Sequence, residues 1–223
     1  MSRFDRNFTR EGYLMNYETP KICAPLNKQV LQFRIELEDI EPAIWRRIQV
    51  PSDCNFWDLH VALQDAMGWL DYHLHHFEIK GKHKRNTVHI GIPDFDRYGG
   101  VQEVFPGWEI PVINYFNDLG VTAIYHYDYG DSWVHTVKLE GYIFREKKQK
   151  YPCCTGGARA CPHEDCGGPP GYMDMIEILS DPENEEYEEM RAWADDWHQE
   201  RFERENITFS NPYRRWVYAF LRG

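Results

Sequence analysis

The sequence contains no long apolar run. No stretch of its 223 residues approaches about 18 uninterrupted apolar residues, the length that a membrane-spanning helix needs. Residues 1–21, MSRFDRNFTREGYLMNYETPK, carry charges throughout and include no continuous apolar segment, so they indicate neither a secretory signal nor a membrane anchor. Both absences predict a cytoplasmic protein without a membrane partner.

Basic residues are in the minority. The chain has 25 Lys and Arg against 36 Asp and Glu, and its formal net charge is −11. A charge of this sign opposes non-specific binding to phosphate groups and to anionic membranes. Short basic runs such as KGKHKR at 80–85 are more often solvated surface than phosphate sites. Nucleic acid is therefore not an expected partner, and a protein partner stays open.

The sequence also lacks a phosphate-binding loop, a nucleophile signature, an internal repeat and a low-complexity linker. Its hydrophobic content of 42% and aromatic content of 15% are those of a folded chain with a core. We expect a loosely ordered lead-in over residues 1–27, one domain over 28–205 and a C-terminal extension over 206–223.

Two periodic patterns define the expected elements. Apolar and polar side chains alternate through residues 30–40 and again through 44–50, which is typical of half-buried strands. After Ser52 or Asp53, either of which can cap a helix, apolar residues recur at three- and four-residue steps until Gly68. Similar patterns predict a strand at 74–81, a hairpin at 123–141, and helices at 175–179, 184–203 and 212–221. The sequence therefore predicts an α+β fold: a mostly antiparallel sheet with one helix after the first strand pair and C-terminal helices packed on the sheet.

The segment CCTGGARACPHEDCGGPPGY, residues 153–172, contains four cysteines. In a reducing cytoplasm, clustered cysteines favour metal or redox chemistry over disulfides. Zinc takes four ligands in a tetrahedron, and we expect Cys154, Cys161 and Cys166 to bind one ion from a loop, with His135 of the hairpin as the fourth ligand. His163 is an alternative fourth ligand. Buried free cysteines in a Gly-Pro loop and a redox role are the competing interpretations.

Carboxylates beside this segment are weaker candidates for chemistry. Glu164 follows Pro162, and if zinc kept an open position it could act as a general base on the bound water. Asp131 lies in the hairpin turn, where an aspartate more often bonds its own backbone. His73 and His75 would share a face of a strand and raise a second metal possibility, although no carboxylate or thiol follows them at a supporting distance.

Several blocks in this order resemble a known family. They are the segment RIELEDIEPAIWRRIQVPSDCNFWDLHVALQDAMGW, then HLHHFEI, YDYGDSWVHTV and GGARACPHEDCGGPPGY, and together they resemble the plasmid pRiA ORF-three-like domain family over residues 30–205. The family typically has Pro-Pro-Glu-Asp where this chain has Pro-His-Glu-Asp at 162–165, and Arg-Cys where it has Cys153-Cys154. The resemblance therefore implies that Cys154 is the matching thiol. It also makes Cys166 the less secure ligand, because family members also have an aliphatic residue at that position.

The resemblance implies no particular activity. Taken with the residue patterns, it leads us to expect a non-catalytic, zinc-stabilised cytoplasmic domain that serves as an interaction module. One alternative is a metal-dependent hydrolase around Glu164 and His135. A second alternative, nucleic-acid processing, is implied only by the occurrence of family members in mobile elements.

Overall fold

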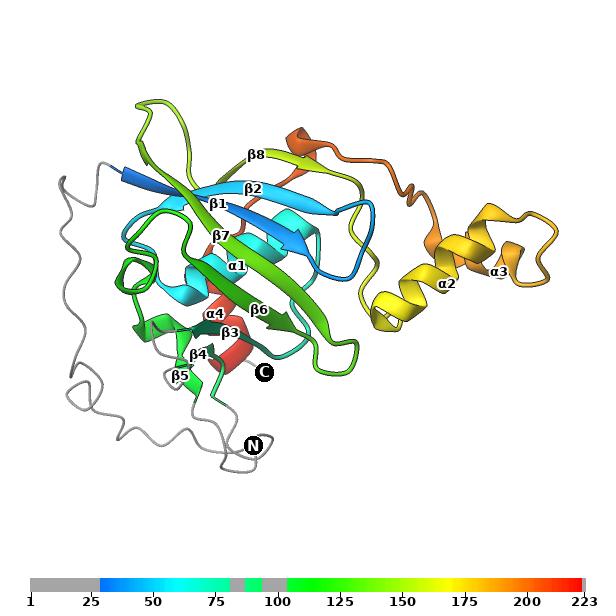
Figure 1. The fold of residues 1–223 in the computed structure, drawn as a ribbon, viewed down its shortest axis with the longest axis horizontal. Helices are drawn as coiled ribbons and strands as arrows, with labels where there is room; N and C mark the ends of the chain where they lie inside the picture. The colour runs from blue at the N-terminus through cyan, green and yellow to red at the C-terminus, as the bar shows by residue number, and fades with distance from the viewer. Residues whose placement is uncertain (1–28, 81–86, 94–103, 222–223) are drawn as a thin grey trace.

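A computed structural model describes residues 29–80, 87–93 and 104–221. The predicted lead-in over 1–27 lies outside the described residues, as does most of the basic run at 80–85. The core of the protein is one eight-stranded sheet with the order β5-β4-β3-β6-β7-β1-β2-β8 (Figure 1). Neighbouring strands are antiparallel except for β4 and β5, which are parallel. The strands are β1 (Gln29–Leu37), β2 (Trp45–Pro51), β3 (His75–Lys80), β4 (Thr87–Gly91), β5 (Val104–Pro106), β6 (Thr122–Tyr127), β7 (Trp133–Phe144) and β8 (Cys153–Ala158).

The alternation in the sequence places one face of this sheet in the core. Along β1, the side chains of Leu31, Phe33, Ile35 and Leu37 are buried and those between them are half-buried. Such a period of two is what a strand with one covered face requires. The predicted α+β class, the antiparallel pair β1–β2 and the β6–β7 hairpin are confirmed.

Helix α1 (Phe56–Met67) covers the buried face of the sheet. Its N-cap is Asn55, whose side chain accepts a hydrogen bond from the amide of Asp58, and not the predicted Ser52 or Asp53. Ser52 instead donates its hydroxyl to the carbonyl of Gln29, so its side chain serves the β1–β2 region. The helix ends at Gly68 as expected, because a φ of +89° is readily adopted only by glycine.

The C-terminal part of the chain is helical: the helix predicted at 212–221 is confirmed, whereas the two helices before it have bounds different from those predicted. Helix α2 begins well before Met175, because Pro169 and Pro170 lie in its first turn, where a missing amide leaves no helical bond unmade. Figure 1 shows α2 and α3 standing to one side of the sheet and α4 lying beside α1. The indole of Trp57 donates to the carbonyl of Pro212 at 2.9 Å, which fastens α4 to α1. These elements are α2 (Gly168–Ser180), α3 (Tyr187–Ala194) and α4 (Pro212–Leu221), and the 3-10 turns are η2 (Gly107–Glu109), η3 (Val112–Asn114) and η4 (Arg204–Asn206).

The first part of the cysteine-rich segment is a strand and not the loop that we predicted. Residues 153–158 form β8, which pairs with β2 at the edge of the sheet. The residues that follow β8 cross to the end of the sheet where β3 begins, β6 ends and β7 begins. Among the described residues, no helix has the length and apolar character needed to span a membrane.

Candidate metal centre

The predicted zinc ligands lie in different surroundings. The thiol of Cys154 faces the carbonyl of Gly156 at 3.3 Å, that of Cys161 contacts the sulfur of Met67 at 3.1 Å, and that of Cys166 lies 4.0 Å from the carbonyl of Gly168. Burial raises the pKa of the thiols of Cys154 and Cys161, which favours neutral thiols over metal-binding thiolates.

His135 lies in the core of the sheet. Its ring packs edge-on against Trp69 and Tyr125, and neither ring nitrogen makes a hydrogen bond. Within the described ranges, no group of three ligand atoms that all lie within 4.8 Å of one another includes a cysteine or His135. The four-ligand zinc site stays a prediction, and the geometry brings other residues together.

Three side chains converge at the end of the sheet, and we call them the His73 cluster: His73, Asp128 and Asp165. The Nε2 atom of His73 lies 3.0 Å from a carboxylate oxygen of Asp165 and 3.5 Å from one of Asp128. This nitrogen is shielded from solvent, yet its geometry satisfies no hydrogen bond to either carboxylate. An imidazole nitrogen and two carboxylate oxygens that converge in this way are ligand types that a divalent cation accepts. The cluster could therefore hold a divalent ion.

Local backbone conformation aims the two carboxylates. Asp128 follows β6 with a φ of +52°, and Asp165 lies between β8 and α2 with a φ of +59°. Aspartate tolerates this left-handed region better than most residues. One oxygen of Asp128 accepts the amide of Gly130 at 2.9 Å, as expected for a turn aspartate, while its other oxygen faces His73. Asp128 is nearly buried, whereas the side chain of Asp165 is 65% exposed, so the cluster opens towards solvent on one side.

Glu164, which the sequence suggested as a general base, fastens the loop that carries Asp165. One of its carboxylate oxygens accepts the hydroxyl of Tyr127 at 2.5 Å, and the other accepts the amide of Leu70 at 2.6 Å. Burial, and then the hydrogen bond to Glu164, raises the pKa of Tyr127 well above its usual range, so the tyrosine remains a donor. Both oxygens of Glu164 are therefore engaged, and the geometry favours a positioning role.

Asp131 fastens the same loop from the hairpin turn. Its carboxylate accepts the amide of Gly167 at 3.1 Å. A Cβ atom at Gly168 would lie 2.2 Å from the carbonyl oxygen of Asp131, so only glycine allows the loop to approach this closely. The indole of Trp69 adds a third contact by donating to the carbonyl of Pro162 at 2.9 Å. These contacts position Asp165 opposite His73.

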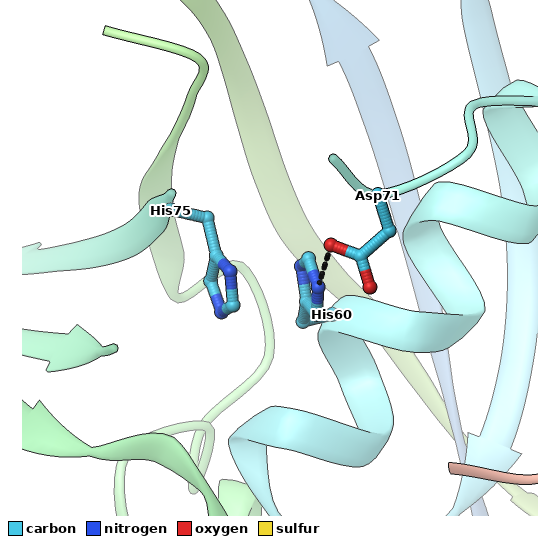
Figure 2. Close-up of side chains that lie close together, drawn as sticks. All are labelled: His60, Asp71 and His75. Carbon is cyan, nitrogen blue, oxygen red and sulfur yellow. Dashed lines mark hydrogen bonds and ion pairs between the residues drawn. The ribbon is translucent and has the colours of Figure 1, made fainter. Parts of the chain in front are cut away.

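A second cluster, His60, Asp71 and His75, is buried beneath the sheet (Figure 2). His60 is bonded on both sides: Nε2 to Asp71 and Nδ1 to the hydroxyl of Tyr125, each at 2.8 Å. Figure 2 shows the imidazole rings of His60 and His75 face to face, and their centroids are 3.4 Å apart with planes within 7°. Imidazole lone pairs lie in the ring plane, so stacked rings do not converge on one ion about 2.0–2.1 Å from each nitrogen. This cluster is better suited to a polar core network.

The pairing of His73 with His75 that the sequence suggested is not formed, because each histidine belongs to a different cluster. The carboxylates that seemed to be missing are provided by tertiary contacts, from Asp71 for one cluster and from Asp128 and Asp165 for the other. Burial, and then the neighbouring His60, lowers the pKa of His75 well below its usual range, so this ring is neutral in the core.

Comparison with known proteins places this architecture in a family. A family profile described as plasmid pRiA4b ORF-3-like protein matches residues 29–206. The chain belongs to this family. The matched region includes every residue of the His73 cluster and both loop-fastening carboxylates, whereas α4 lies beyond it.

Two relatives share most of the chain. An uncharacterised protein of Sinorhizobium fredii, y4hQ, is 32% identical over 166 residues, which cover 74% of this chain and 80% of the relative. The crystal structure of a protein of unknown function from Methanosarcina mazei Go1, MM3350, is similar with a TM-score of 0.73 and 38% identity, and the match covers 82% of this chain and 99% of that one. The Methanosarcina mazei structure supports the fold, and neither relative's description names an activity.

Proposed function

We propose that the protein binds a divalent cation through His73, Asp128 and Asp165 and uses it for hydrolysis. The observation that carries the proposal is the shielded Nε2 atom of His73, which makes no hydrogen bond although two carboxylate oxygens lie 3.0 and 3.5 Å away. A buried nitrogen without a partner is unfavourable, and a cation placed between the three ligand atoms would satisfy it.

The ligand types support a catalytic ion more than a closed structural one. One imidazole and two carboxylates suit zinc or manganese, and catalytic zinc sites typically combine three protein ligands with a water molecule. The exposed side chain of Asp165 leaves room for that water. A zinc ion held by these three residues would lower the pKa of its bound water to about 7 and so would supply hydroxide as the nucleophile. Glu164 is not required as a base, in agreement with its two occupied oxygens.

The second candidate is a metal-stabilised interaction module as expected from the sequence, but with the ion on the His73 cluster in place of the ligands predicted there (Cys154, Cys161, Cys166 and His135), where it would only crosslink the loop to the sheet. The position of Asp165 within that loop supports it, because an ion on the His73 cluster would crosslink the loop to the sheet. The contacts of Glu164, Asp131 and Trp69 already hold the loop against the rest of the fold, so an ion would add less to the stability of the loop.

Metal titration of the chelator-treated protein tests the ligand set. We expect one zinc or manganese ion per chain by calorimetry, and an affinity lower by more than about 100-fold in His73→Ala and Asp128→Asn, because each removes a ligand and not merely a supporting contact. His163→Ala is the matched control. His163 lies in the same loop as Asp165, but its ring packs against Trp193 of α3 and is outside the His73 cluster, so the metal affinity of this variant should be unchanged. Equal affinity in the wild type and His73→Ala would overturn the proposal.

The two candidates differ in water access. With manganese bound, an open coordination position gives strong enhancement of water proton relaxation, whereas an ion enclosed by protein ligands gives little. Enhancement supports the hydrolase, and its absence in a manganese-loaded protein supports the structural ion. A panel of phosphoester, carboxylic ester and amide substrates then identifies the bond that is cleaved, with His73→Ala as the inactive reference.

A further inference from the structure

A cavity of about 410 Å³ lies between α2 and α3, and Asp165 of the His73 cluster is among the residues that line it. Asp165 belongs to both, since its carboxylate approaches His73 and its side chain also lines the cavity. The volume is within the range of small-molecule sites. A molecule in this cavity would therefore lie next to Asp165, one of the three proposed ligands.

The charged residues that line the cavity all carry negative charge. They are Asp165, Glu186 and Glu189, and no lysine or arginine is among the described residues that line it. The side chains of Glu186 and Glu189 form no ion pair or hydrogen bond with the residues that the structure describes. The net charge of −11 strengthens the attraction of this surface for cations at long range.

The remaining wall is apolar and suits a flexible chain. Met175 and Met190 line the cavity, the first buried and the second half-buried, and unbranched thioethers of this kind adapt to alkyl groups. Trp193 lines the same cavity and is 48% exposed, an unusual exposure for so large an apolar side chain. An indole face attracts ammonium groups through its quadrupole. The cavity thus combines an apolar wall, an aromatic surface and unpaired carboxylates.

We infer that this cavity binds an alkylammonium group and that the substrate of the neighbouring ion carries one. The first half of the inference rests on the cavity alone, and only the second half rests on the proposed function. In the bound state, the ammonium group lies between Glu186, Glu189 and the face of Trp193, its alkyl chain lies along the methionines, and the bond to be cleaved lies beside Asp165.

Calorimetry on the metal-free full chain tests the cavity. We expect pentylamine to bind, and the uncharged analogue pentanol to bind at least about tenfold more weakly, because it forgoes the charge interactions. The double variant Glu186→Gln/Glu189→Gln should weaken pentylamine by about tenfold. Glu188→Gln, on the same helix but outside the cavity, is the matched control and should bind normally. Equal binding of the amine and the alcohol, or equal binding by the double variant and the wild type, would overturn the inference.

Two further measurements identify the source of the ammonium group and separate this inference from the proposed function. Cadaverine and Nα-acetyl-lysine amide carry the same ammonium group, and tighter binding of one identifies a free amine or a lysine side chain as the source. Metal titration of the same samples separates the two proposals. A protein that binds pentylamine but no metal overturns the proposed function and the substrate half of this inference and leaves the amine site standing, whereas one that binds metal but no amine overturns only this inference.

Discussion

Replacement of His135 by leucine should alter the pH dependence of stability in a defined way. The ring is fully buried on β7, and neither nitrogen has a hydrogen-bond partner. Burial lowers the pKa of His135 to about 3, and this effect outweighs the opposing influence of the Tyr125 backbone, while His126 lowers the pKa slightly further. The folded protein therefore contains a neutral imidazole throughout the mildly acidic range.

The magnitude follows from proton linkage. Above about pH 6.5 the imidazole is neutral in both the folded and the unfolded chain, so it contributes no pH dependence. Below that pH the unfolded chain takes up a proton that the folded chain excludes, and stability falls as the pH falls towards the folded pKa. The loss is about 1.4 kcal/mol for each pH unit, or about 2 kcal/mol at about pH 5.

Urea unfolding at about pH 7.5 and about pH 5 measures this difference. The free energy of unfolding of His135→Leu, relative to wild type, should rise by about 2 kcal/mol between the two conditions. His198→Leu, at an exposed position, is the control and should show no such change. A relative stability of His135→Leu that does not change with pH would refute the reasoning. Destabilisation of the wild type by a chelator to the level of the variant would instead favour the zinc site predicted from the sequence.

Three other substitutions test the loop, the C-terminal helix and the cysteines. Gly168→Ala should lower metal affinity by about 10- to 100-fold in calorimetry, because its Cβ would collide with the backbone of Asp131 and displace the loop; unchanged affinity would show that the loop position does not matter. Arg215→Met should lower the free energy of unfolding by about 1–2 kcal/mol in urea, since it removes the 2.7 Å contact with the nearly buried Asp65; no change would mean that α4 is held by its apolar contacts. Cys161→Ser should leave the metal content unchanged in elemental analysis. Loss of the ion in this variant would favour the zinc site that the sequence predicted at the cysteines.

The spacing of apolar residues predicted correctly those helices and strands whose structure is determined by their own sequence. The alternation in residues 30–40 and the apolar spacing before Gly68 identified β1 and α1, because a strand has a period of two and a helix a period of 3.6 whatever their partners. The segment 153–158, CCTGGA, has no such alternation, and it is a strand because β2 offers it an edge to pair with. Its conformation depends on that neighbour, which local spacing does not encode.

Two segments singled out from the sequence contribute to the His73 cluster, but through residues other than those chosen. The metal ligands predicted from the sequence were Cys154, Cys161, Cys166 and His135, with Asp131 and Glu164 as weaker catalytic candidates, whereas Asp128 and Asp165 are the residues that approach His73. Choosing between adjacent carboxylates requires the direction of each side chain. That direction follows from positive φ values and from the docking of the loop on the hairpin turn, neither of which a spacing pattern reveals.

The adjacent acidic residues Glu164 and Asp165 have different roles in the loop. One oxygen of Glu164 accepts the hydroxyl of Tyr127 in β6 and the other accepts the amide of Leu70 after α1, which fixes the loop so that the carboxylate of Asp165 lies towards His73. A general base must direct an oxygen at the attacking water, whereas each oxygen of Glu164 already accepts a hydrogen bond from the protein. Hydrolysis at this centre would then depend on hydroxide formed at the ion itself, so its pH dependence would follow the bound water, with a pKa of about 7 on zinc, and not the titration of a carboxylate.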